Sequence, residues 1–179
     1  MSRLDIAFNL LRLTLVLAFV STGIAEAQTT REEALAQAFP GAEIRAERVF
    51  LTEDQRSAAQ VQSGVEVPSL LIARYVATAG GDSVGIAYVD THVVRTKNES
   101  LLISLDPEGR IVRIEVTAFL EPLEYTAPEA WLAQYEGQVL NADLNLNRTI
   151  RPIAGATLTA RAATAAVRRV LAIDAVLNE

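Results

Sequence analysis

Residues 70–119 alternate between β-rich segments and connections too short to contain a helix, and this constrains the fold more than any other feature of the chain. Residues 70–77 and 84–94 are rich in Leu, Ile, Val and Tyr, and Gly80-Gly81-Asp82 lies between them. Consecutive glycines favour a tight hairpin, because the central residues of such turns need positive φ angles. The two segments are therefore predicted to pair as antiparallel strands.

Two further β-rich segments continue this pattern. Residues 101–105 follow Lys97-Asn98-Glu99, which is typical of a turn, and residues 110–119 follow Asp106-Pro107-Glu108-Gly109. Proline at the second position of the latter fits a type I or type II turn. Residues 43–51 alternate between apolar and polar side chains and predict one more strand. The short connections predict an antiparallel meander.

Helical patterns flank these strands. Residues 30–39, 52–62 and 128–135 predict short helices, and the Ala-rich residues 159–177 predict the longest one. Thr30 with a glutamate three residues later forms a capping box at the start of the first helix. Helices around an antiparallel sheet define an α+β fold, here with a long C-terminal helix.

Residues 1–27 have the three-part layout of a secretory signal peptide. Arg3 and Arg12 precede or border an apolar stretch, and Ala25-Glu26-Ala27 fits a small-x-small cleavage site. The apolar stretch is shorter than the roughly 20 residues that span a bilayer. The alternative is an uncleaved N-terminal anchor. In both cases residues 28–179 are expected to form a single domain outside the cytoplasm, in the periplasm or at the cell surface.

The composition excludes several classes of function. The formal net charge is −6, and an acidic chain without a basic cluster is a poor partner for nucleic acid. The absence of cysteine excludes disulfides, iron–sulfur clusters and thiolate metal sites. The one histidine, His92, cannot form a metal site alone, and we expect no metal. This ring either faces a ligand or makes structural hydrogen bonds.

Small residues crowd together in residues 153–160, just before the long helix. Such a segment lets backbone N–H groups approach an anion, and a helix N-terminus adds unpaired donors and a partial positive charge. A phosphate fits there for physical reasons. Thr157 lies at or near the helix start, so the alternative is a plain N-cap with small residues for tight packing.

Several segments resemble the FMN-binding domain family, which includes the C subunit of sodium-pumping NADH:quinone reductase and the G subunit of Rnf-type electron-transport complexes. Residues 154–160, Ala-Gly-Ala-Thr-Leu-Thr-Ala, are similar to the family's Ser-Gly-Ala-Thr-x-Thr-Ser segment. Residues 105–111 resemble its Asp-x-x-Gly-x-Ile hairpin, and Glu121-Pro122 a reduced form of its His-x-Glu-Thr-Pro region. Residues 38–42 resemble the end of its early helix. The resemblance spans most of residues 30–175.

The resemblance implies FMN as the cofactor. In that family the Thr of Gly-Ala-Thr can receive FMN through a phosphoester bond made by a flavin transferase, and the matching residue is Thr157. The family's covalent motif usually has Asp six residues earlier, where this chain has Arg151, and Ser where this chain has Ala154. Arg151 can itself pair with a phosphate, so covalent and non-covalent binding both stay open.

The candidate cofactor-binding residues share either the resemblance or the ability to bind phosphate. They are Ala154, Gly155, Ala156, Thr157, Thr159, Arg151 and Glu121. For Glu121 the alternative is a surface carboxylate. Trp131 can stack on a ring, but its spacing from Tyr135 favours a core-facing position on a helix.

The resemblance implies an exported flavoprotein that carries electrons to or from membrane-bound redox partner proteins. Such a chain is a component of electron transport rather than a stand-alone enzyme, because the flavin supplies the chemistry and the protein sets its position. The alternative is a non-catalytic exported binding module, or an accessory factor of a respiratory complex, because fold alone does not determine function.

Overall fold

The computed structural model describes residues 30–178, which form a five-stranded antiparallel sheet flanked by helices. The strand order is β1-β2-β3-β4-β5, so each strand pairs with its neighbour in sequence. The strands are β1 (Glu43–Phe50), β2 (Leu71–Ala79), β3 (Asp82–Val93), β4 (Asn98–Leu105) and β5 (Ile111–Phe119). The predicted meander and the α+β class are confirmed. The predicted signal peptide of residues 1–27 lies outside the described residues.

The turns that separate the strands follow the local sequence. Ala79 pairs with Asp82, so Gly80 and Gly81 form a two-residue hairpin loop with φ angles of 61° and 96°. The Asp106 carboxylate accepts the backbone N–H groups of Glu108 and Arg110, which closes the turn before β5.

The predicted turn Lys97-Asn98-Glu99 is misplaced, because β4 already begins at Asn98. Val93 pairs with Asn98 and His92 with Glu99, so the loop consists of residues 94–97. Asn and Glu are typical of turns, but Glu99 is fully buried and contacts His92 across the strands, and this tertiary contact overrides local preference.

Two helices begin with capping boxes. Thr30 caps α1 (Arg31–Ala38) with Glu33, as predicted, and Thr52 caps α2 (Glu53–Ser63) with Gln55. The predicted helix of residues 128–135 is a short α3 (Glu129–Leu132) followed by the 3₁₀ turn η2 (Ala133–Tyr135). A further 3₁₀ turn, η1 (Leu123–Tyr125), follows β5.

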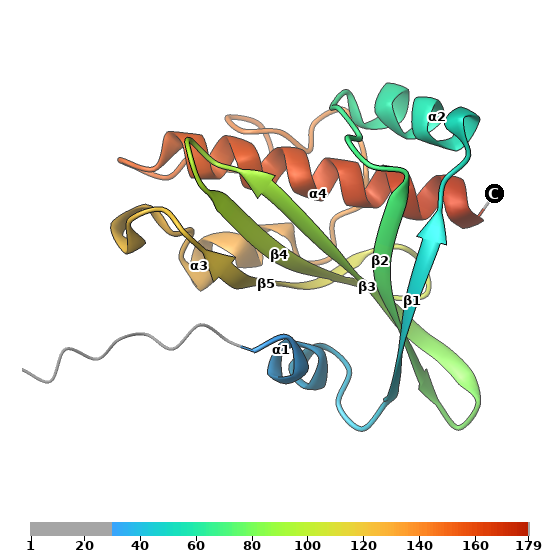
Figure 1. The fold of residues 1–179 in the computed structure, drawn as a ribbon. Coiled ribbons are helices and arrows are strands. Elements are labelled where there is room, and N and C mark those ends of the chain that lie inside the picture. Colours follow the sequence, from blue (N-terminus) through green and yellow to red (C-terminus); the bar gives the residue numbers. More distant parts are fainter. Residues whose placement is uncertain (1–29, 179) are drawn as a thin grey trace, which may run out of the picture.

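The helices cover both faces of the sheet (Figure 1). The long α4 (Thr157–Asn178) lies across one face beside α2, and α1 lies on the other face. The main core packs α4 against the sheet through residues such as Leu101, Ile103 and Val167. A smaller core packs α1 against Ala77, Ala87 and Leu102. The amino end of α4 is thereby fixed near the end of the sheet where β3 and β4 are joined.

Candidate functional site

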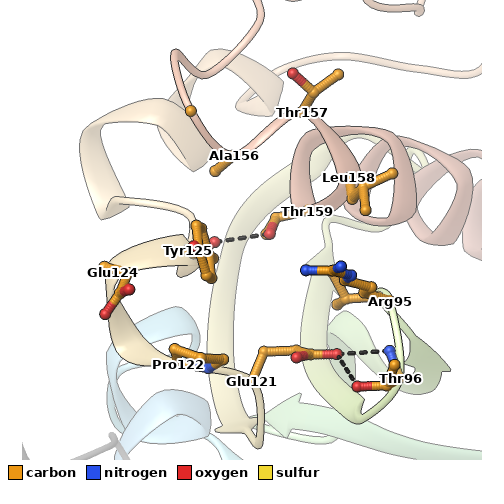
Figure 2. Close-up of a pocket in the computed structure, with 12 residues that line it drawn as sticks. Arg95, Thr96, Glu121, Pro122, Glu124, Tyr125, Ala156, Thr157, Leu158 and Thr159 are labelled. Carbon is orange, nitrogen blue, oxygen red and sulfur yellow. Dashed lines mark hydrogen bonds between the residues drawn. The ribbon is translucent and has the colours of Figure 1, made fainter.

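A pocket of about 550 Å³ lies at the amino end of α4, and three separate segments line it (Figure 2). The first is the start of α4, the second is the β3–β4 turn, and the third is the chain after β5. Its lining residues are Val94, Arg95, Thr96, Glu121, Pro122, Glu124, Tyr125, Gly155, Ala156, Thr157, Leu158 and Thr159. This volume falls within the range of small-molecule sites, about 300–1,000 Å³.

The first turn of α4 has free backbone donors at this pocket. The helix begins at Thr157, and its first hydrogen bond runs from the Ala160 N–H to the Ala156 carbonyl at 3.0 Å. Ala156 therefore occupies the N-cap position, and its methyl group cannot accept a hydrogen bond. Within residues 30–178 no side chain caps this helix. Thr157 is thus the first helical residue beside the N-cap position, the alternative of a plain Thr157 N-cap does not hold, and the free N–H groups remain available to an anion.

The two threonines of this turn have different surroundings. The Thr159 side chain is buried, and its hydroxyl donates to the Tyr125 carbonyl at 2.7 Å, which joins α4 to η1. Thr157 is exposed, and Figure 2 shows its side chain directed away from Arg95 and Glu121. Thr159 is therefore engaged in holding the pocket wall, whereas the Thr157 hydroxyl is accessible from solvent.

Glu121 holds the opposite wall. Its Oε1 accepts the backbone N–H groups of Thr96 at 2.6 Å and Lys97 at 2.8 Å, together with the Thr96 hydroxyl at 3.2 Å. Backbone hydrogen bonds from Thr96 and Lys97 hold the pKa of Glu121 below its ordinary value. The predicted site residue is thus in the pocket, where its carboxylate secures the β3–β4 turn.

Arg95, rather than Arg151, is the arginine that lines the pocket. Its side chain lies between the first turn of α4 and Glu121 (Figure 2). Arg151 is outside the lining; its backbone N–H donates to the Gln134 side chain, and its carbonyl accepts from the Trp131 indole. The structure brings Gly155, Ala156, Thr157, Thr159 and Glu121 together and leaves Arg151 and Ala154 outside this lining.

Sequence reasoning did not find Arg95, Tyr125 or Leu158. Arg95 belongs to the β3–β4 turn, which comes beside the chain after β5 only because β4 pairs with both neighbours. The Leu120 N–H donates to the Asn98 carbonyl at 3.0 Å and fixes this proximity. The available signal was the meander itself, since it places this turn and the end of β5 at one end of the sheet.

Buried polar contacts set the position of α4 over the sheet. Arg169 donates to both carboxylate oxygens of Asp90, at 2.7 and 2.9 Å. The Tyr88 hydroxyl donates to Asp174 at 2.8 Å. Burial, the charge of Asp174 and the bond to it raise the pKa of Tyr88. These directional contacts fix the helix along its axis more tightly than apolar packing alone.

His92 is not part of the pocket lining. Its Nδ1 is 2.9 Å from Asp90, and its Nε2 is 3.0 Å from the fully buried Glu99. Burial alone would lower the pKa of His92, but the hydrogen bonds to Asp90 and Glu99 outweigh it and raise the pKa to about 9. The prediction of a structural, hydrogen-bonded histidine therefore fits better than a ligand-facing one.

Trp131 has the predicted core-facing position. Its ring packs edge-on against Tyr135, with centroids 5.5 Å apart, and its indole donates to the Arg151 carbonyl at 2.6 Å.

Residues 30–178 contain no group of three or more acidic or histidine side chains arranged to hold a metal ion. None of the helices in this part of the chain has the length and apolar character needed to cross a membrane. No family model, curated protein or solved structure matches the chain.

Proposed function

We propose that this chain binds FMN in the pocket at the amino end of α4 and acts as an extracytoplasmic electron carrier. The observation that carries the proposal is the uncapped first turn of α4, which opens onto a pocket that also contains Arg95. Free N–H groups, the helix dipole and a guanidinium favour a phosphate at the same place.

The residues present suit both parts of the cofactor. The backbone N–H groups of residues 157–159 would hold the phosphate, and Arg95 would offset its charge. Tyr125 and Leu158 offer exposed apolar surface to a ring system, and both line the pocket. When bound, FMN would supply the one- and two-electron redox chemistry. The protein would hold it at the surface, within reach of membrane-bound redox partner proteins.

The exposed Thr157 hydroxyl supports covalent attachment as one route. A flavin transferase needs access to the acceptor oxygen, and Thr157 is solvent-exposed beside the free donors of the helix. Arg151 does not line the pocket, so in non-covalent binding the guanidinium that pairs with the phosphate would be that of Arg95.

The test is to co-express the full chain with a flavin transferase in an exporting host and to record the visible spectrum and the intact mass. A mass increase equal to attached FMN that is absent in Thr157→Ala supports covalent carriage. Colour that is lost on denaturation supports non-covalent FMN. Thr149→Ala, which changes a threonine outside the pocket, is the matched control and should keep the flavin.

A colourless protein that also ignores added FMN would overturn the proposal. That result would favour the alternative, a non-catalytic exported binding module or accessory factor of a respiratory complex.

A further inference from the structure

β1 is an edge strand, and one of its sides is open within the described residues (Figure 1). The Leu51 N–H donates to the carbonyl of Leu70, the residue directly opposite, at 2.8 Å. Hydrogen-bonded and non-hydrogen-bonded pairs alternate along an antiparallel ladder. The backbone N–H and C=O groups that point away from β2 are therefore those of Ile44, Ala46, Arg48 and Phe50.

The side chains of these same residues share the face of the sheet that carries α1. Ile44 and Ala46 line a groove of about 340 Å³ with Leu35, Phe39 and Ala42. Phe50 follows on the same face at the far end of the strand, and it is 72% exposed. One end of β1 thus offers an apolar groove and the other an exposed aromatic ring.

A second copy of the chain fits this edge in one antiparallel register. With Ala46 opposite Ala46 of the second copy, the open backbone groups face each other, and Phe50 comes opposite Ala42 of that copy. The exposed ring of each copy then lies beside the groove of the other. The arrangement is two-fold symmetric, so each contact occurs twice.

Charge selects this register over its neighbours. On the opposite face it places Arg45 directly across from Glu47 of the second copy. Arg45 contacts Glu47 of its own chain, but its side chain is 71% exposed and can also reach the second copy's carboxylate. Shifting the pairing by two residues in either direction also keeps the open backbone groups opposite each other. One shift places Glu47 opposite Glu47 of the second copy, and the other places Arg45 opposite Arg45. Like charges directly opposite across strands are destabilising, and opposite charges are favourable.

We propose that two copies of this chain pair through β1, antiparallel, with Ala46 on the two-fold axis and Phe50 of each copy in the groove of the other. The sheet then continues across both copies, and main-chain hydrogen bonds supply the affinity while the ring and the ion pairs set the register. The pairing involves the edge opposite to β5 and does not depend on flavin.

Sedimentation equilibrium of the flavin-free chain over a range of concentrations tests the pairing. The wild-type chain should sediment as a dimer that dissociates on dilution. Phe50→Ser should raise the dissociation constant by about tenfold or more. Val61→Ser, which alters another exposed apolar side chain away from β1, should leave it unchanged.

Two charge variants test the register. Arg45→Glu and Glu47→Arg each place like charges across the axis, so each alone should be a monomer. An equimolar mixture of the two variants restores opposite charges at both positions and should form a heterodimer. Circular dichroism checks that both variants fold.

A wild-type chain that is monomeric at about 100 μM would overturn the proposal, because its dimer dissociation constant would then be far above that of specific interfaces. A dimer that is unaffected by Phe50→Ser and by both charge variants would overturn the proposed surface. Folded single variants whose mixture stays monomeric would overturn the register.

Discussion

The Glu121 carboxylate lies 2.6 Å from the backbone nitrogen of Thr96 and joins the chain after β5 to the β3–β4 turn. This contact closes one side of the pocket, and the bond from Thr159 to the Tyr125 carbonyl closes the other. The pocket walls are thus held by side chains that belong to elements distant in sequence. The start of α4, with its free donors, is the remaining wall.

Glu121→Ala should loosen the β3–β4 turn without unfolding the sheet. We expect the amides of Thr96 and Lys97 to exchange with solvent about tenfold faster, because each loses its acceptor. The measurement is hydrogen exchange by NMR. Glu124→Ala is the control, since Glu124 also lines the pocket but accepts no backbone N–H group of the turn.

The hydrogen bonds that the Glu121 carboxylate accepts should also weaken at low pH. The pKa of the folded state is lowered from 4.5, so the stabilising contribution is present above about 4.5 and is lost as the pH falls through the lowered pKa. The measurement is the exchange rate of the Thr96 amide above pH 4.5 and below the lowered pKa, with each rate corrected for the intrinsic effect of pH on exchange. An unchanged corrected rate would contradict this role of Glu121.

Arg169→Gln should destabilise the fold by about 3 kcal/mol, because it leaves the Asp90 carboxylate buried without its bidentate partner. Hydrogen bonds from His92 and Arg169 outweigh burial and hold the pKa of Asp90 low, so this carboxylate stays charged. Urea unfolding measures the difference. Arg161→Gln, at an exposed position on the same helix, should change stability by less than about 0.5 kcal/mol.

The His92 ring should titrate near pH 9, and its signal is unambiguous because the chain contains one histidine. The folded pKa is raised from 6.5, so the stabilisation is fully present below about pH 6.5 and is lost as the pH rises through about 9. NMR titration measures the pKa, and urea unfolding at both ends measures the loss, about 3 kcal/mol. A ring that titrates near 6.5 would show that the contacts to Asp90 and Glu99 do not hold in solution.

Gly85→Ala should cost about 2 kcal/mol or more, because a Cβ at this position would collide with the Phe39 ring and lie 2.5 Å from the Leu105 carbonyl oxygen. Thermal unfolding measures it. At Gly137→Ala the added methyl group has open space, and only the positive φ of 72° opposes the substitution, so the loss should be smaller, about 1 kcal/mol. Equal losses would contradict a packing role for Gly85.

Much of the fold follows from local sequence. The Gly80-Gly81 hairpin, the Asp106 turn and the Thr30 capping box each encode their structure in a few adjacent residues. The start of β4 does not, because Asn98 and Glu99 are polar and enter the strand through pairing with Val93 and His92. Local preference cannot reveal a partner that another strand supplies.

The candidate site likewise contains residues that local sequence predicts and residues that only the tertiary structure reveals. Gly155, Ala156, Thr157 and Thr159 could be predicted from small residues and hydroxyls before a long helix, and they do line the pocket. Arg151 is a candidate phosphate partner because its guanidinium takes the position of the family's Asp, but it lies outside the pocket lining, and its backbone bonds to Trp131 and Gln134. Arg95 is near in space and 62 positions away from Thr157 in the sequence. The packing of α4 across the sheet, which local sequence does not show, brings them together.

The most direct test of a phosphate at the start of α4 compares FMN with riboflavin, which lacks the phosphate. Both flavins are titrated with the purified chain, and flavin fluorescence reports binding. FMN should bind at least about tenfold more tightly, and Arg95→Gln should reduce that preference. Equal affinity for the two flavins, or no binding of either, would contradict the proposed phosphate site.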